Sequence, residues 1–228
     1  SAEYVSANAV AAVSASTRDP RQAFEELVAL AGQVNPAFAQ EFAQMQARAG
    51  VDVGSDIASA LGTDFTIAVE QPTIPVPGCI AAVEVNQPAL LDSALRRLAA
   101  SVNGAAAASG QPAAVSIETE QADGRSWTVL RNSRSKLALW WTYDRGYWVI
   151  GTDRALAAAA IATRSGGAPL VRSAQFQAQL PASAGLRQSG FFWLNTQGPI
   201  ASIAAVFGGS TLKSLLDSRE PVLIVVNG

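Results

Sequence analysis

The chain has 228 residues, of which 49% are hydrophobic and 15% are charged, and its net charge is −2. This composition predicts a globular protein with a sizeable core and excludes a disordered chain. The small negative charge leaves no broad basic surface, so nucleic acid is not expected as a partner.

Histidine is absent, and Cys79 is the only cysteine. These absences exclude a histidine-based triad, a histidine-containing zinc site and an internal disulfide. We expect Cys79 to be a small core residue, and we expect neither a metal nor a cofactor. Asp52 and Asp56 could suggest calcium, but their pattern is more typical of a helix cap.

No apolar stretch approaches the roughly 18 residues that a membrane-spanning helix needs. The chain does not open with a signal peptide, and it stops directly after the apolar stretch PVLIVV. We therefore expect no membrane span in this chain, and we expect the sequence to be part of a longer protein.

A short apolar strand followed by a polar cap and an amphipathic helix occurs four times along the chain. The four copies begin at Ala9, Cys79, Tyr147 and Phe191. In the first copy, Asp19 is expected to cap a helix that has Pro20 at its first position, where the missing N–H costs nothing.

The first half of the chain is predicted from periodicity and from helix-stop signals. The expected elements are a strand at Val10–Ala15, helices from Pro20 and from Pro36 to Gly50, a short helix at Ser55–Leu61, strands at Phe65–Glu70 and Cys79–Val85, and a helix from Pro88 to Val102. Residues 103–114, which are rich in Gly, Ala and Ser, are expected to form a mobile loop.

The second half begins with a predicted β meander. Asp123-Gly124 and Arg145-Gly146 are favourable two-residue hairpin turns within it. The expected elements are strands at Val115–Glu120, Trp127–Arg131, Leu137–Tyr143 and Tyr147–Gly151, helices from Thr152 and at Ser173–Leu180, a strand at Gly190–Leu194, helices from Pro199 and at Thr211–Asp217, and a strand at Val222–Val226.

Strands joined mainly by hairpins indicate an α+β fold with a mainly antiparallel or mixed sheet. We expect the helices to pack largely on one face of that sheet. The whole chain, 1–228, is expected to be one domain, and the order of elements leaves open two related halves, 1–102 and 115–228.

Four segments together resemble an uncharacterised bacterial family known as domain of unknown function 3352. They are AVAAVSASTRDPRQAFEELVAL, DVGSDIASALGTDFTIAVEQ, VEVNQPALLDSALRRL and YWVIGTDRALAAAAI. The resemblance implies an exported or envelope-anchored protein whose signal or anchor lies outside this sequence. It implies no catalytic residues.

A Ser-x-x-Lys pattern occurs at Ser210–Lys213 and at Ser133–Lys136. In penicillin-binding enzymes this spacing places a serine hydroxyl one helical turn from a lysine that can help to activate it. The accompanying Lys-Thr-Gly or Lys-Ser-Gly element is absent. We therefore expect no catalytic residues, and the alternative is a serine hydrolase that uses Ser210 and Lys213.

Aromatic residues suggest a binding surface. Trp140 and Trp141 are adjacent on one expected strand, so their side chains point to opposite faces. Tyr143 shares the face of Trp141 and could extend an aromatic surface to Trp148 or Tyr147, with Arg145 at its rim. Two interpretations stay open, a core on both sides of the sheet or an exposed surface that binds a protein, a glycan or a lipid.

We expect a non-catalytic, extracytoplasmic binding or structural module that is periplasmic, secreted or envelope-anchored. Its partner would be another protein, or a small apolar or glycan ligand bound near Trp140, Trp141, Tyr143, Trp148 and Arg145. Besides the serine hydrolase, a carrier of a small apolar ligand is the other alternative.

Overall fold

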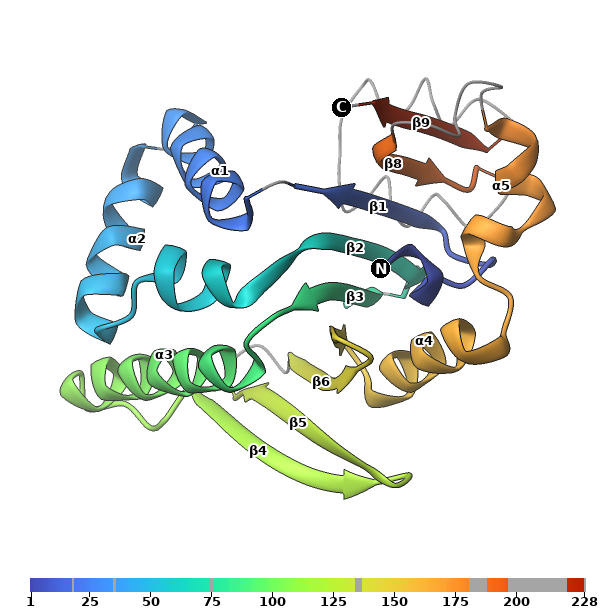
Figure 1. The fold of residues 1–228 in the computed structure, drawn as a ribbon. Coiled ribbons are helices and arrows are strands. Elements are labelled where there is room, and N and C mark those ends of the chain that lie inside the picture. Colours follow the sequence, from blue (N-terminus) through green and yellow to red (C-terminus); the bar gives the residue numbers. More distant parts are fainter. Residues whose placement is uncertain are drawn as a thin grey trace. The chain divides into compact units, whose positions relative to one another are not determined.

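The computed structural model describes residues 1–17, 19–34, 36–73, 76–133, 137–180, 188–196 and 221–227 (Figure 1). The chain divides into two compact units that alternate along the sequence. Unit 1 consists of Ser1–Ser16, Asp64–Val83 and Leu139–Gly228, and unit 2 of Thr17–Thr63 and Glu84–Ala138. Whether the chain also contains two related halves stays a prediction.

Unit 1 is built on an antiparallel sheet. Its described strands are β1 (Ala11–Ser16), β2 (Leu61–Gln71), β3 (Gly78–Val85), β6 (Ala138–Asp144), β7 (Tyr147–Gly151), β8 (Gln188–Leu194) and β9 (Val222–Asn227). They follow the order β6-β7-β3-β2-β1-β8-β9. The pairings of β1 with β2 and β8, of β6 with β7 and of β8 with β9 are all antiparallel, which confirms the expected α+β class.

The strand register defines two faces of this sheet. Ser14 pairs with Thr66 and with Phe191, so these three side chains share one face, called here the helix face. The Tyr147 hydroxyl donates to Asp64 Oδ2 at 2.8 Å, which places both of these residues on the helix face as well.

The described helices of unit 1 pack on the helix face, as expected. They are η1 (Ala2–Tyr4), α4 (Arg154–Gly166), η4 (Leu170–Arg172) and α5 (Ala174–Gln179). In η1, the Tyr4 ring lies 5.4 Å from the Tyr147 ring, and in α5 the Phe176 ring lies 5.0 Å from the Phe191 ring. The core between these layers includes Ala12, Ala68, Ile80, Ala82, Val149 and Trp193, all of which are buried.

The opposite side of the same sheet, called here the far face, carries an exposed apolar row. The register aligns Ile67, Val13, Phe192 and Ile224 across β2, β1, β8 and β9. Ile67, Val13 and Ile224 are 51%, 43% and 52% exposed. The two faces of this sheet therefore differ, because one packs against helices and the other presents apolar side chains.

Unit 2 contains a helical part and a hairpin. Its elements are α1 (Pro20–Val34), α2 (Pro36–Ala49), η2 (Val53–Ile57), η3 (Ala58–Ala60), α3 (Pro88–Ala108), β4 (Val115–Ala122) and β5 (Arg125–Asn132). The Asp19 carboxylate accepts hydrogen bonds from the backbone N–H groups of Arg21 and Gln22 at 2.9 and 3.2 Å. This confirms Asp19 as the cap of α1.

The helix α3 is longer than predicted. Residues 103–114 were expected to form a loop, but the helix continues to Ala108. Alanine has the highest helix propensity, so the alanine run favours the helix over a loop. The Asn103 amide then ties the helix to β4, because its Nδ2 donates to the Val115 carbonyl at 2.7 Å and its Oδ1 accepts from Ala114 and Val115.

Both predicted hairpin turns are confirmed. Asp123 and Gly124 have φ values of 55° and 70°, and Arg145 and Gly146 have φ values of 48° and 82°. Positive φ at both central residues is the geometry that matches the twist of the flanking strands. Arg145 therefore occupies a backbone conformation that is unfavourable for most side chains other than Gly, Asn and Asp.

Because of this conformation, we expect Arg145→Asn to raise the free energy of unfolding by about 0.5–1 kcal/mol. Arg145→Val is the matched control, and its β-branched side chain should lower that free energy at the same position. Urea denaturation of the three proteins measures the effect. Equal stabilities of the Asn and Val variants would contradict this account of the turn.

Candidate functional site

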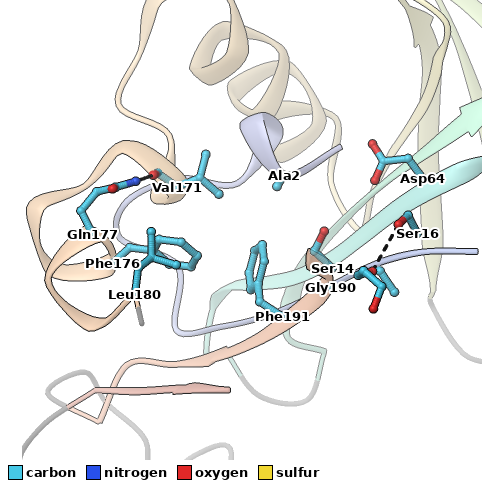
Figure 2. A pocket seen from close by; sticks show the side chains of 12 residues that line it. Ala2, Ser14, Ser16, Asp64, Val171, Phe176, Gln177, Leu180, Gly190 and Phe191 are labelled. Carbon is cyan, nitrogen blue, oxygen red and sulfur yellow. Dashed lines mark hydrogen bonds between the residues drawn. The ribbon is translucent and has the colours of Figure 1, made fainter. Parts of the chain in front are cut away.

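A cavity of about 300 Å³ lies on the helix face of unit 1 (Figure 2). Strands β1 and β8, the segment from η4 through α5, and residues Ala2 and Asp64 line it. This volume is at the lower end of the range for small-molecule sites, so the cavity suits a compact ligand.

One wall of the cavity is apolar and rigid. Phe176 and Phe191 meet edge to face and are only 4% and 7% exposed. The Phe176 ring also packs against the buried Trp193, with ring centroids 5.6 Å apart. Val171 and Leu180 complete this wall in Figure 2. Aromatic contacts of this kind hold the rings in fixed positions.

The floor of the cavity requires a glycine at position 190. A Cβ atom on Gly190 would lie 2.3 Å from the backbone carbonyl oxygen of Ser14. The lack of a side chain therefore lets β8 approach β1 closely.

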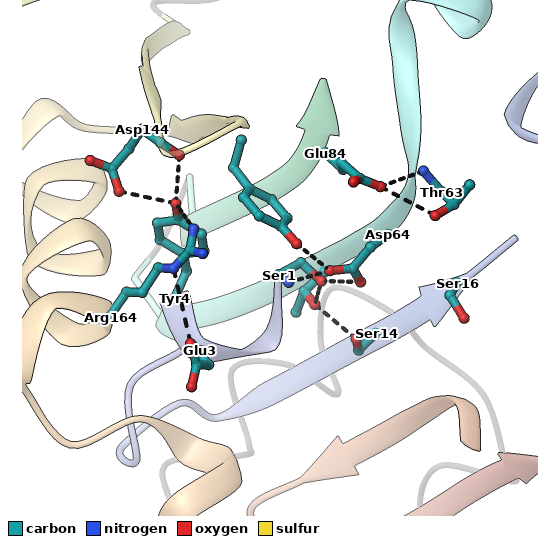
Figure 3. Close-up of polar contacts among 12 residues, drawn as sticks. Ser1, Glu3, Tyr4, Ser14, Ser16, Thr63, Asp64, Glu84, Asp144 and Arg164 are labelled. Atoms are coloured by element: carbon teal, nitrogen blue, oxygen red, sulfur yellow. Dashed lines mark hydrogen bonds and ion pairs between the residues drawn. The ribbon is translucent and has the colours of Figure 1, made fainter. Parts of the chain in front are cut away.

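The other wall of the cavity is polar. The hydroxyls of Ser14 and Thr66 are hydrogen-bonded at 2.9 Å, and those of Thr66 and Ser1 at 2.6 Å. The Ser1 hydroxyl in turn donates to Asp64 Oδ1 at 2.6 Å. A chain of hydrogen-bonded groups thus crosses from β1 to the Asp64 carboxylate (Figure 3).

Asp64 is the acceptor at the end of this chain. Its Oδ2 accepts from the Ser1 backbone nitrogen and from the Tyr147 hydroxyl. Burial acts to raise the pKa of Asp64, but the hydrogen bonds from Ser1 and Tyr147 outweigh it and lower the pKa below its usual value. Asp64 is therefore ionised at neutral pH.

A second cluster holds η1 on the sheet. The Tyr4 hydroxyl donates to the Asp144 backbone carbonyl at 2.8 Å and accepts from the Arg164 guanidinium. The same guanidinium lies 4.7 Å from the Tyr4 ring and 4.8 Å from the Tyr147 ring. These contacts fix the residues that follow Ser1 at the edge of the cavity (Figure 3).

The predicted aromatic surface is divided between the two faces of unit 1. The register pairs Trp140 with Gly151, Trp141 with Ile150 and Tyr143 with Trp148. This pairing places Trp140 on the helix face, where its ring lies 5.9 Å from the Arg154 guanidinium. Trp141, Tyr143 and Trp148 share the far face.

Trp141 contributes packing rather than open surface. It is 3% exposed, and its ring meets the Trp148 ring at 84° with centroids 6.0 Å apart. Among the described residues, the indole N–H groups of both tryptophans are buried without a hydrogen-bond partner. Tyr143 and Trp148 are half-buried, and only Arg145 of the predicted set is exposed.

The predicted catalytic alternative lies outside the described residues. Ser210 and Lys213 fall within 197–220, and Lys136 falls within 134–136. The structure does place Ser133, whose hydroxyl donates to the backbone carbonyls of Ala113 and Ala114 at 3.3 Å. The Ser133 hydroxyl is therefore engaged with the backbone.

The residues considered for metal chemistry have structural contacts. Asp52 accepts from the Ser55 backbone N–H at 3.1 Å and so caps η2. Burial raises the pKa of the half-buried Cys79 thiol, which keeps it protonated. In the ranges that the structure describes, no group of three or more His, Cys, Asp and Glu could hold a metal ion.

Sequence reasoning did not identify the cavity residues. A signal was present, since Ser14 and Ser16 alternate along β1 while Asp64 and Thr66 alternate along β2. Alternating polar residues mark one face of a strand. This alternation predicts that β1 and β2 carry polar side chains on one face of the sheet. It does not predict that Phe176 and Phe191 lie opposite those side chains.

The family described as "Protein of unknown function (DUF3352)" matches residues 1–220. The chain belongs to this family. The resemblance seen in the sequence is therefore confirmed for almost the whole chain. No curated protein and no solved structure matches it, and none of the described helices is long and apolar enough to cross a membrane.

Because hydrogen bonds hold the pKa of Asp64 below its usual value, its charged form stabilises the folded protein. This stabilisation is present above about pH 3.9 and is lost as pH falls through the folded-state pKa. Asp64→Asn should therefore lower the free energy of unfolding by about 1–2 kcal/mol at pH 7. Urea denaturation between pH 7 and pH 2.5 should show this gap closing, and a gap independent of pH would contradict the assignment.

Proposed function

We propose that this protein is a non-catalytic bacterial module that acts outside the cytoplasm and binds a small, partly apolar ligand in the cavity of unit 1. The observation that carries this proposal is the opposition of two walls in one cavity. Phe176 and Phe191 form an aromatic wall, and Ser14 and Asp64 belong to a hydrogen-bonded polar wall. Sites for small molecules typically combine a mainly apolar lining with a few fixed polar groups.

The polar wall favours binding over catalysis. Each hydroxyl of the chain from Ser14 to Ser1 is hydrogen-bonded to another hydroxyl or to Asp64. A nucleophilic serine needs an adjacent base such as histidine or lysine, and none of the residues known to line this cavity is a histidine, lysine or arginine. The described polar groups are thus arranged to orient a ligand.

The location outside the cytoplasm is supported by the sequence resemblance, since members of the family look exported or envelope-anchored. A chain with one cysteine is compatible with that location because it needs no disulfide. Fractionation of bacteria that produce the full-length protein tests this part of the proposal. Recovery from the cytoplasm alone would overturn it.

Ligand binding is tested with 4-phenylbutan-1-ol, a neutral probe with an apolar body and one hydroxyl. We expect binding in the millimolar range, as is usual for a compound of this size. In an NMR titration, the backbone amides of Ser14, Ser16 and Phe191 should shift. Val171→Phe fills the cavity from its apolar wall and should weaken binding by about tenfold or more.

Val13→Phe is the matched control for this experiment. This variant also replaces a valine by a phenylalanine, but in β1 and on the far face of the sheet. Val13 is 43% exposed there. This variant should bind the probe as the native protein does. If the native protein does not bind the probe, or if both variants bind it equally well, the cavity is not the ligand site.

A further inference from the structure

The far face of the unit 1 sheet is an open apolar surface on the side opposite the cavity. We propose that this face binds the same face of a second copy of the chain, so that two unit 1 sheets stack into a weak, two-fold symmetric dimer. The contact is centred on Val13 and Phe192, which pair at the middle of β1 and β8.

The first argument is the composition of the face. The register of β2, β1, β8 and β9 places twelve positions on it in three rows. Each of these positions holds an apolar residue or a glycine, so a contact through them removes no polar side chain from water. The rows are Val69, Ala11, Leu194 and Val222, then Ile67, Val13, Phe192 and Ile224, and then Phe65, Ala15, Gly190 and Val226.

Exposure is concentrated in the second and third rows. Ile67, Val13 and Ile224 are exposed, and so is Val226, at 53%. Leu194 in the first row is buried. Adjoining apolar side chains that remain exposed on a folded domain are typical of an interaction surface, and here they come from three strands of one sheet.

The second argument is charge. None of the twelve positions carries a charge, so two copies can meet through this face without bringing like charges together. Gln71, which follows Val69 on this face of β2, is polar but uncharged. A surface that lies on a membrane usually combines apolar side chains with Lys and Arg that attract anionic lipids. These positions hold no basic residue, which favours a protein partner over a lipid surface.

The third argument is shape and size. Two twisted sheets pack face to face about 10 Å apart with their strands rotated by about 30°, because their twists are alike. Twelve positions that lie about 4.8 Å apart between strands and about 6.8 Å apart along a strand cover roughly 400 Å² of each copy. Two such faces bury about 800 Å² or more, which is the range of weak, reversible complexes. Homodimer interfaces are also more apolar than those between different proteins, so a second copy suits this face.

Sedimentation velocity of the 228-residue chain tests the dimer. Concentrations between about 10 μM and about 1 mM bracket the affinity of a weak interface. We expect a monomer–dimer equilibrium with a dissociation constant on the order of 100 μM. A chain that stays monomeric throughout this range, or that grows into species larger than a dimer, would overturn the two-fold contact.

Charge variants assign the dimer to the far face. Val13→Lys should weaken dimerisation by about tenfold or more, because two like charges would be buried at the centre of the contact. Ile224→Lys repeats the change on β9. Val102→Lys is the matched control, since Val102 lies on α3 of unit 2 and is 39% exposed, close to the exposure of Val13. This control should dimerise as the native protein does.

Circular dichroism verifies that the three variants fold. A dimer that persists in both Val13→Lys and Ile224→Lys, or that is also lost in Val102→Lys, overturns the assignment to the far face. Co-sedimentation with vesicles of phosphatidylcholine and phosphatidylglycerol tests the competing occupant, and we expect no binding. Vesicle binding that Val13→Lys abolishes would assign the far face to lipid and would overturn the dimer.

Discussion

The register of β1 between β2 and β8 is the constraint on which the rest of unit 1 depends. Backbone hydrogen bonding aligns Ser14 with Thr66 on one side and with Phe191 on the other. Because strand side chains alternate, this single alignment directs the serines toward the helices and Val13 away from them. The cavity and the apolar row are therefore two products of one pairing.

Two buried polar clusters complete the helix face. Tyr4 and Arg164 hold η1 against the sheet, and Asp64 with Tyr147 holds the segment that begins at Ser1. Burial is the main factor that raises the pKa of Tyr4 to about 12, so its hydroxyl remains a donor at neutral pH. Buried polar groups are stable only when they are hydrogen-bonded, and here that requirement also positions the edge of the cavity.

Features with a local chemical cause could be predicted from the sequence. The cap at Asp19 and the turns at Asp123-Gly124 and Arg145-Gly146 follow from rules that involve only a few neighbouring residues. The split of Trp140 and Trp141 between two faces follows from alternation along one strand.

Features that depend on distant residues could not be predicted. Nothing near Ser14 in the sequence indicates that Phe191 lies beside it, and nothing near Asp64 indicates Tyr147. The extension of α3 to Ala108 has another cause, since the low complexity of the alanine run is typical of a loop while its helix propensity favours a helix. The burial of Trp141 likewise depends on contacts such as that with Trp148, which strand periodicity does not reveal.

The pairing of β1 with β8 also has a consequence for how the protein folds. Val13 and Phe192 are adjacent in the sheet although most of the chain separates them. Contacts between such distant residues slow folding, because the entropy of closing the intervening chain is lost before the contact forms. During synthesis, β1 and β2 emerge long before β8 exists. Val13 then remains without its neighbour Phe192 until β8 is made, so an apolar side chain of β1 stays unpaired in the nascent chain.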